Sequence, residues 1–193
     1  MTSKTIELSL DEIFNLAKAS LLKHGANEEN ADAVANTVTN AERDGSLSHG
    51  LFRIPGYIKA LQSKKVDGSA KPEIKEVTPT IFRCDAKNGF APLAHKYSLK
   101  PLIEAAHKFG IAGVAIQRSH HFAALWPEVE TISENGLVGL TSVSSTPAVA
   151  PAGGPTALFG TNPMSFAWPR PGKNPIVFDM ATSSRAKGEI QIA

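Results

Sequence analysis

Residues 46–53 read SLSHGLFR, and this short stretch decides how the whole chain is interpreted. It brings a hydroxyl, an imidazole and a guanidinium close together in the sequence. If a helix begins near Gly50, one helical turn carries Arg53 back towards His49. A guanidinium binds a carboxylate through two parallel hydrogen bonds, and histidine exchanges a proton near neutral pH. The stretch therefore predicts proton transfer on a small carboxylic acid. The competing interpretation is that Ser48 caps a helix while His49 and Arg53 lie on the surface.

The residues on either side of this stretch predict a helical N-terminal region. Ser9 and Glu12 have the spacing of a capping box, and His24 followed by Gly25 is a common helix end. Apolar residues recur with helical spacing through the same region. We expect three helices, at about residues 9–24, 27–43 and 53–63.

The pattern changes after residues 66–79, which we interpret as a connection between elements. From Thr80 onward, apolar strand-like runs alternate with helical patterns, and this alternation is typical of α/β layers. We expect strands at residues 80–84, 111–117, 137–143 and 176–180, with helices at about 95–109 and 124–134. The expected organisation is a helical region over residues 1–70 and an α/β domain over residues 71–193.

Composition and missing motifs exclude several classes of function. The 20 basic and 18 acidic residues are scattered, which argues against a nucleic-acid-binding surface. No apolar stretch is long enough to span a bilayer and no signal segment is recognisable, so we expect no membrane contact and a cytoplasmic location. His120 and His121 are adjacent and lack metal-ligand spacing, so no metal site is expected. Neither a Gly-x-Gly-x-x-Gly motif nor a P-loop occurs, which argues against a Rossmann domain.

Two further segments add a family resemblance. Residues 119–127 read SHHFAALWP and follow an apolar run, while FGTNPMSF at 159–166 precedes PIVFDMATS at 175–183. Together with residues 46–53, these segments resemble the malate/L-lactate dehydrogenase family that lacks a Rossmann fold. The form of residues 121–126 is most similar to the Δ1-piperideine-2-carboxylate/Δ1-pyrroline-2-carboxylate reductase branch. The resemblance implies a mixed-sheet α/β domain of the L-sulfolactate-dehydrogenase type.

The resemblance also implies a reaction and its residues. A small cyclic imine carboxylate would be reduced to the L-amino acid with NADPH, or alternatively with NADH. His49 would donate the proton with Ser48 orienting it or relaying the proton, while Arg53 would hold the substrate carboxylate. Glu189 matches an acidic catalytic position that is aspartate in the branch, and Thr161 matches a substrate-binding hydroxyl. The cofactor site would be lined by His121, Phe122, Ala123, Ala124, Leu125, Asp179, Met180 and Ala181.

Other interpretations of the same residues stay open. Glu189 is equally well an exposed acid, Thr161 a turn residue bonding its own backbone, and residues 121–125 a helix start packed on the sheet. Exposed amides at a helix start also suit a phosphate. A malate- or lactate-type 2-hydroxy-acid dehydrogenase is the alternative enzyme, and a catalytically silent binding or assembly domain is the alternative of another class.

Family members are longer than these 193 residues, so we expect a fragment or a truncated product. We also expect a homodimer, because the resemblance implies one and because an incomplete domain leaves apolar surface to be covered.

Overall fold

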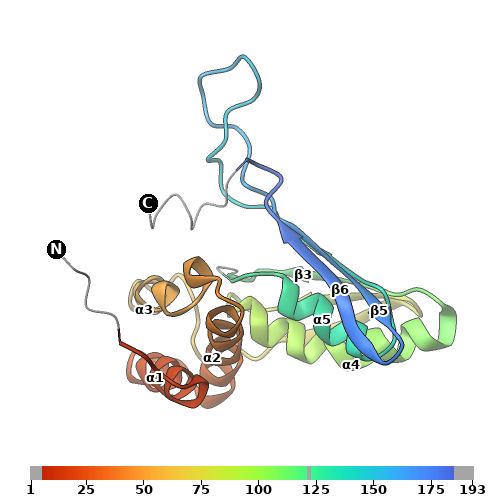
Figure 1. The fold of residues 1–193 in the computed structure, drawn as a ribbon, viewed down its shortest axis with the longest axis horizontal. Helices are drawn as coiled ribbons and strands as arrows, with labels where there is room; N and C mark the ends of the chain where they lie inside the picture. The colour runs from red at the N-terminus through yellow and green to blue at the C-terminus, as the bar shows by residue number, and fades with distance from the viewer. Residues whose placement is uncertain (1–5, 121–122, 185–193) are drawn as a thin grey trace. The chain divides into compact units, whose positions relative to one another are not determined.

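A computed structural model of the chain describes residues 6–120 and 123–184 (Figure 1). The chain forms two compact units, each assembled from separate stretches. The first comprises residues 1–75, 83–97 and 115–123, and the second comprises 76–82, 98–114 and 124–193. The boundary expected near residue 70 stays a prediction.

Three α-helices begin the first unit and confirm the expected helical region: α1 (Leu10–Lys23), α2 (Glu28–Arg43) and α3 (Ile54–Gln62). The capping box before α1 is present, because Ser9 Oγ accepts from the Glu12 amide at 3.2 Å and Glu12 Oε2 accepts from the Ser9 amide at 2.8 Å. Asn27 Oδ1 caps α2 by accepting from the Asn30 amide at 3.0 Å. Side-chain capping of this kind satisfies amides that have no partner within the helix.

The apolar faces of these three helices meet in one core. Leu21 from α1 and Val34 from α2 are completely inaccessible to solvent, and Tyr57 from α3 is 1% exposed. The ring of Tyr57 meets Phe90 edge to face, with centroids 5.4 Å apart. Fully burying a large apolar side chain stabilises a fold by about 1.5–3 kcal/mol, so this core holds the helices that carry residues 46–53.

A three-stranded sheet has the order β1-β2-β3, with β1 at Glu73–Thr78, β2 at Ile81–Asp85 and β3 at Gly113–Gln117. The helix α4 (Ala91–Phe109) connects β2 to β3. Just beyond these strands, Phe90 and His120 form a parallel bridge. We expected a connection over residues 66–79, which is wrong for β1. Its sequence EIKEVT is exposed at all but one position, as is typical of a charged edge strand rather than of an alternating one.

A second three-stranded sheet has the order β4-β5-β6 and lies in the second unit. Its strands are β4 (Gly139–Ser142), β5 (Met164–Arg170) and β6 (Lys173–Met180), and all neighbours are antiparallel. The helix α5 (Trp126–Glu134) packs against all three strands. The sequence interpretation missed β5, because Pro169 interrupts its pattern. A register shift between Trp168 and Arg170 accommodates the proline.

Parallel and antiparallel pairings therefore occur together, and the expected mixed α/β fold is confirmed. In the described ranges, no helix has the length and apolar character needed to cross a membrane.

Candidate active site

Residues 46–53 follow directly from the end of α2. That helix ends in a backbone motif in which the Ser46 amide donates to the Ala41 carbonyl at 2.8 Å, while Gly45 has a φ of +74°. A left-handed residue at this position favours glycine, which lets the chain turn sharply out of the helix. Two short 3-10 turns follow, η1 (Leu47–His49) and η2 (Leu51–Arg53). The helix considered from Gly50 therefore begins as a single 3-10 turn, and α3 begins only at Ile54.

The imidazole of His49 is held through one of its nitrogens. Ser48 Oγ lies 3.0 Å from His49 Nδ1, and Ser46 Oγ lies 3.4 Å from the same atom. Ser48 is buried, whereas Ser46 and His49 are half-buried. We predicted the contact of Ser48 but missed that of Ser46. The i, i+3 spacing of Ser46 and His49 was the available signal, because a 3-10 turn brings such residues to the same side.

Arg53 lies at the end of the second 3-10 turn, where α3 begins. Its side chain is half-buried, and its Cζ lies 5.9 Å from the centroid of the Phe52 ring. Burial lowers the pKa of Arg53, but a guanidinium stays protonated in proteins. One helical turn later, burial raises the pKa of Tyr57, which keeps its phenol neutral. The sequence interpretation names Arg53 as a site residue, whereas Tyr57 belongs to the core of the helical region.

In the second unit, Asp179 joins two of the segments predicted to line a cofactor site. Its Oδ2 accepts from the backbone amides of Leu125, at 2.7 Å, and Trp126, at 2.9 Å. Leu125 and Ala124 are buried, as is Ala123. Because the Leu125 and Trp126 amides already donate to a carboxylate, they are not the donors of a phosphate site at this helix start.

Asp179 and Met180 lie on opposite faces of the sheet. Neighbouring residues of a strand point to opposite faces, so Asp179 faces α5 whereas Met180 lies on the other face. Met180 is half exposed, and Ala181, which follows the end of β6, is half-buried. The three residues predicted together are thus contiguous in sequence, but Asp179 and Met180 do not share a face.

Thr161 is buried in a loop of the second unit. Its Oγ1 lies 3.2 Å from Ser145 Oγ, and its carbonyl accepts from the Thr182 amide at 2.9 Å and from the Thr182 hydroxyl at 3.0 Å. Asn162 Oδ1 accepts from the Ser145 amide at 3.0 Å. The Thr161 hydroxyl therefore contacts another side chain rather than its own backbone. Ser145 lies in a region read only as strand and loop, and nothing in its sequence context singled it out.

The predicted residues are thus distributed over both units. Ser48, His49 and Arg53 belong to the first, and Thr161 and Asp179 belong to the second. His121, Phe122 and Glu189 were also predicted, and they lie outside the described residues. Within the described ranges, no three His, Cys, Asp or Glu side chains lie close enough together to hold a metal ion.

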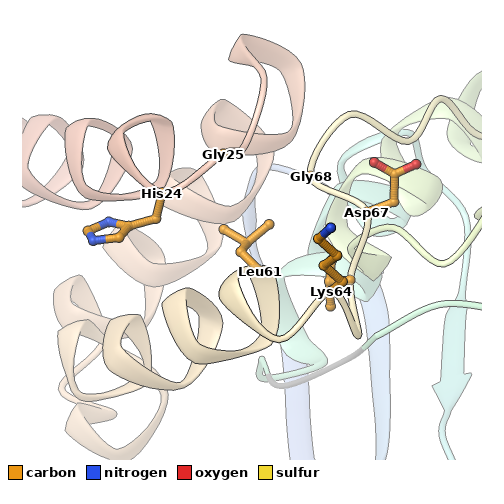
Figure 2. Close-up of a pocket in the computed structure, with 7 residues that line it drawn as sticks. His24, Gly25, Leu61, Lys64, Asp67 and Gly68 are labelled. Atoms are coloured by element: carbon orange, nitrogen blue, oxygen red, sulfur yellow. The ribbon is translucent and has the colours of Figure 1, made fainter.

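A pocket of about 280 Å³ lies elsewhere in the first unit, where α1 and α3 end (Figure 2). His24, Lys64 and Asp67 contribute its polar groups, while Leu61 and Val66 contribute apolar surface. None of the predicted site residues lines it.

Comparison with known proteins connects these residues to one family. The family model described as malate/L-lactate dehydrogenase matches residues 8–193. A Δ1-pyrroline-2-carboxylate/Δ1-piperideine-2-carboxylate reductase from Pseudomonas syringae pv. tomato is 48% identical over 189 residues, which are 98% of this chain and 55% of the relative. A reductase of the same name from Pseudomonas aeruginosa is 46% identical over 187 residues, covering 97% of this chain and 56% of the relative.

Solved structures give the same result. The crystal structure of Δ1-piperideine-2-carboxylate reductase from Pseudomonas syringae pv. tomato matches with a TM-score of 0.93 and 47% identity, over 97% of this chain and 57% of that one. Sulfolactate dehydrogenase from Methanocaldococcus jannaschii matches with a TM-score of 0.88 and 29% identity, over 97% and 54% of the two chains. The chain spans about half the length of the curated relatives it matches. On this evidence, the chain belongs to the malate/L-lactate dehydrogenase family.

Proposed function

We propose that the protein containing this chain reduces a small cyclic imine carboxylate, such as Δ1-piperideine-2-carboxylate or Δ1-pyrroline-2-carboxylate, to the L-amino acid. The observation that carries the proposal is the pair formed by His49 and Arg53. The imidazole is fixed through Nδ1 by Ser48, and a half-buried guanidinium follows four residues later. The names of the relatives that this chain resembles supply the substrate class.

Reduction of a C=N bond adds a hydride to carbon and a proton to nitrogen. In the proposed mechanism, His49 supplies the proton from Nε2, because Ser48 and Ser46 hold Nδ1 and thereby fix the direction of the ring. A positioned acid of near-neutral pKa typically accelerates such a step by 10²–10⁴-fold. We assign Glu189 an assisting role in this proton transfer.

Arg53 holds the substrate carboxylate in this proposal. Its partial burial removes competing water, and a guanidinium can bind both carboxylate oxygens in a fixed plane. Thr161 is assigned a polar contact with the substrate, since its buried hydroxyl is oriented by Ser145. Such positioning aligns the C=N bond for attack.

The reductant is NADPH, with NADH as the alternative, and it supplies the hydride when bound. The fit of this chain to a nicotinamide cofactor is supported by Asp179, which holds the backbone of Leu125 and Trp126 against β6. Residues 121–125, together with Met180 and Ala181, would hold the cofactor through apolar contacts and backbone groups. The cofactor phosphates would be bound by hydrogen-bond donors other than the Leu125 and Trp126 amides, which already donate to Asp179.

A steady-state assay tests the reaction. Δ1-Piperideine-2-carboxylate and Δ1-pyrroline-2-carboxylate are compared with pyruvate and oxaloacetate, each with NADPH and with NADH. We expect the imines to be reduced with the higher kcat/KM. Equal or better turnover of the 2-oxo acids would instead support a malate- or lactate-type dehydrogenase, which the structural match to malate dehydrogenase from Pyrococcus horikoshii favours as second candidate.

A second experiment separates an enzyme from a silent binding domain. Trp126 lies beside the Asp179 contact, so its fluorescence reports on the proposed cofactor site. Replacing the exposed Trp168 by Phe leaves Trp126 as the single tryptophan. Quenching by micromolar NADPH together with turnover supports the enzyme, whereas binding without turnover identifies a silent domain.

We also propose that the protein is a homodimer. One face of the β4-β5-β6 sheet exposes Leu140, Trp168, Ile176 and Phe178, and it carries no charge at these positions. An apolar face without charges at these positions fits an identical face of a second copy. Sedimentation equilibrium should show a dimer that Ile176→Glu dissociates, whereas the exposed Ile111→Glu does not. A monomer at high concentration contradicts the proposal.

A further inference from the structure

We propose that Glu42 is a positioning residue for the reaction. Its carboxylate fixes Gly50 and Leu51, which form the hinge between the two 3-10 turns that carry His49 and Arg53. The catalytic consequence rests on the proposed function, whereas the structural role does not.

The first observation is a remote cap. Glu42 Oε1 accepts from the backbone amide of Leu51 at 2.7 Å, and Leu51 is the first residue of η2. An amide at the start of a helical turn has no partner within that turn. The residue before the turn commonly supplies one from its side chain, but here that residue is Gly50, which has no side chain. A carboxylate from α2 takes this role, and hydrogen bonds to charged acceptors are the stronger ones.

The second observation is the space at Gly50. A Cβ atom built there would lie 2.5 Å from Glu42 Cδ and 2.8 Å from Glu42 Cγ, and it would also meet Oε1. Real Cβ atoms do not approach other atoms this closely, so any larger residue at position 50 must displace the Glu42 side chain. The Glu42 carboxylate can therefore occupy its position only because residue 50 has no side chain.

The third observation is that the backbone of Glu42 is fixed. It lies in the last turn of α2, next to the completely buried Ala41, and its carbonyl accepts from the Gly45 amide at 3.1 Å. Arg53 is tied to the hinge in turn, because its amide donates to the Gly50 carbonyl at 2.9 Å. The hinge lies between His49 and Arg53 in the sequence, so Glu42 sets the separation of the proton donor and the carboxylate anchor.

A double-mutant cycle tests this device in the full chain, with Glu42→Ala, Gly50→Ala and the combination of both. The first readout is hydrogen exchange of the Leu51 amide, which does not depend on turnover. Glu42→Ala should accelerate exchange by about tenfold to a hundredfold, because a hydrogen bond to a charged group is lost. Gly50→Ala alone should do the same, because its methyl displaces the carboxylate. In the double variant, the Leu51 amide should exchange no faster than in Glu42→Ala. Unchanged exchange in Glu42→Ala, or effects that multiply in the double variant, would overturn the proposal.

The second readout is kinetics with Δ1-piperideine-2-carboxylate, well below the melting temperature. Glu42→Ala should lower kcat/KM by about tenfold or more, with the Kd of NADPH unchanged, while Glu42→Gln keeps an acceptor oxygen and should stay within about threefold of wild type. The capping role would be contradicted if Glu42→Gln lowered kcat/KM as much as Glu42→Ala does. If the wild-type protein that contains this chain turns over no imine, the proposed function fails, and the Leu51 exchange cycle still decides whether Glu42 holds the hinge.

Two control variants match these substitutions. Glu28→Ala removes another acidic residue of α2, one that pairs with Lys18 at 2.8 Å and lies at the opposite end of the helix. Gly56→Ala adds a methyl group in α3 at a position where the new Cβ meets nothing within 4 Å apart from its chain neighbours and the backbone of its own helix. Both should leave Leu51 exchange and kcat/KM at wild-type values. A loss in either control equal to that of its partner variant would show that Glu42 and Gly50 have no special role.

Discussion

The helical region around residues 46–53 and the β4-β5-β6 sheet bury their apolar residues differently. In the helical region, the faces of α1, α2 and α3 close on one another, and Leu21 and Val34 are inaccessible to solvent. In the sheet, α5 covers only one face, where Ala167 is inaccessible. The opposite face leaves Leu140 65% exposed and Phe178 43% exposed.

This difference suggests separate roles: the helical region positions the predicted site residues, and the open face of the sheet favours association with another surface. A closed core fixes the turn that follows α2, because each helix is held by tight packing on its neighbours. A sheet with an open apolar face contributes little stability through that face and instead favours contact with another surface. Variants in the helical region should therefore impair stability or catalysis directly, whereas variants on the open face should impair association.

The largest effect is expected in the helical region at the proton donor. His49→Ala should lower kcat for imine reduction by about two to four orders of magnitude, because proton transfer loses its positioned acid. Cofactor affinity should hardly change. Stopped-flow or steady-state assays measure the effect, with His107→Ala on the exposed side of α4 as control. Turnover near the wild-type value would remove His49 from the mechanism.

A matched pair of leucine variants compares the two regions directly. Leu21→Ala opens a cavity in the closed core and should lower the free energy of unfolding by about 2–5 kcal/mol. Leu140→Ala on the open face should change it by less than about 0.5 kcal/mol. Urea denaturation followed by circular dichroism measures both. Similar losses in the two variants would mean that the sheet face is buried in solution.

Arg53→Lys tests the carboxylate anchor in the helical region. Lysine cannot reproduce the planar two-point contact, and loss of a hydrogen bond to a charged group costs about 1.5–3 kcal/mol. We expect KM for the imine to rise by roughly tenfold to a hundredfold while NADPH binding persists. Arg83→Lys, at an exposed position of β2, is the control. Unchanged kinetics in Arg53→Lys would withdraw the anchor role.

Asp179→Ala tests the contact that the covered face of the sheet makes with α5. It removes a carboxylate that caps two amides, and loss of a helix cap costs about 0.5–2 kcal/mol. Asp179→Asn keeps an acceptor and should lose less. Thermal denaturation gives the stability, and Trp126 fluorescence reports the local change. An Ala variant as stable as wild type would show that the cap contributes nothing.

The smallest effect concerns an ion pair in the first unit. The Arg118 side chain bonds to Asp85 and, with the Lys87 amide, lowers the pKa of Asp85 from 3.8 to about 2. Because the pKa is lower in the folded state, the stabilisation is present above pH 3.8 and is lost as the pH falls towards 2. Asp85→Asn should flatten the pH dependence of stability over that interval only. An unchanged slope in acid titrations followed by circular dichroism would contradict this assignment.

Local signals predicted the helices well, because caps and apolar periodicity act over a few residues. Ser9 and Asn27 marked helix starts that the structure confirms. The strands were harder to predict. The edge strand β1 has no buried face to impose alternation, and Pro169 obscured β5. The family resemblance, rather than periodicity, supplied the cofactor and substrate assignments, and their residue roles stay predictions.

The sequence by itself determined the family, the three N-terminal helices and the adjacency of Ser48, His49 and Arg53, since these depend on residues close together in the chain. The tertiary structure alone decided which distant groups meet. Asp179 reaches the Leu125 amide across 54 residues, Thr161 meets Ser145, and Glu42 reaches across the hinge to Leu51. The physical reason is that a hydrogen bond needs two atoms within about 3 Å, and only the packing of helices and strands brings such partners together.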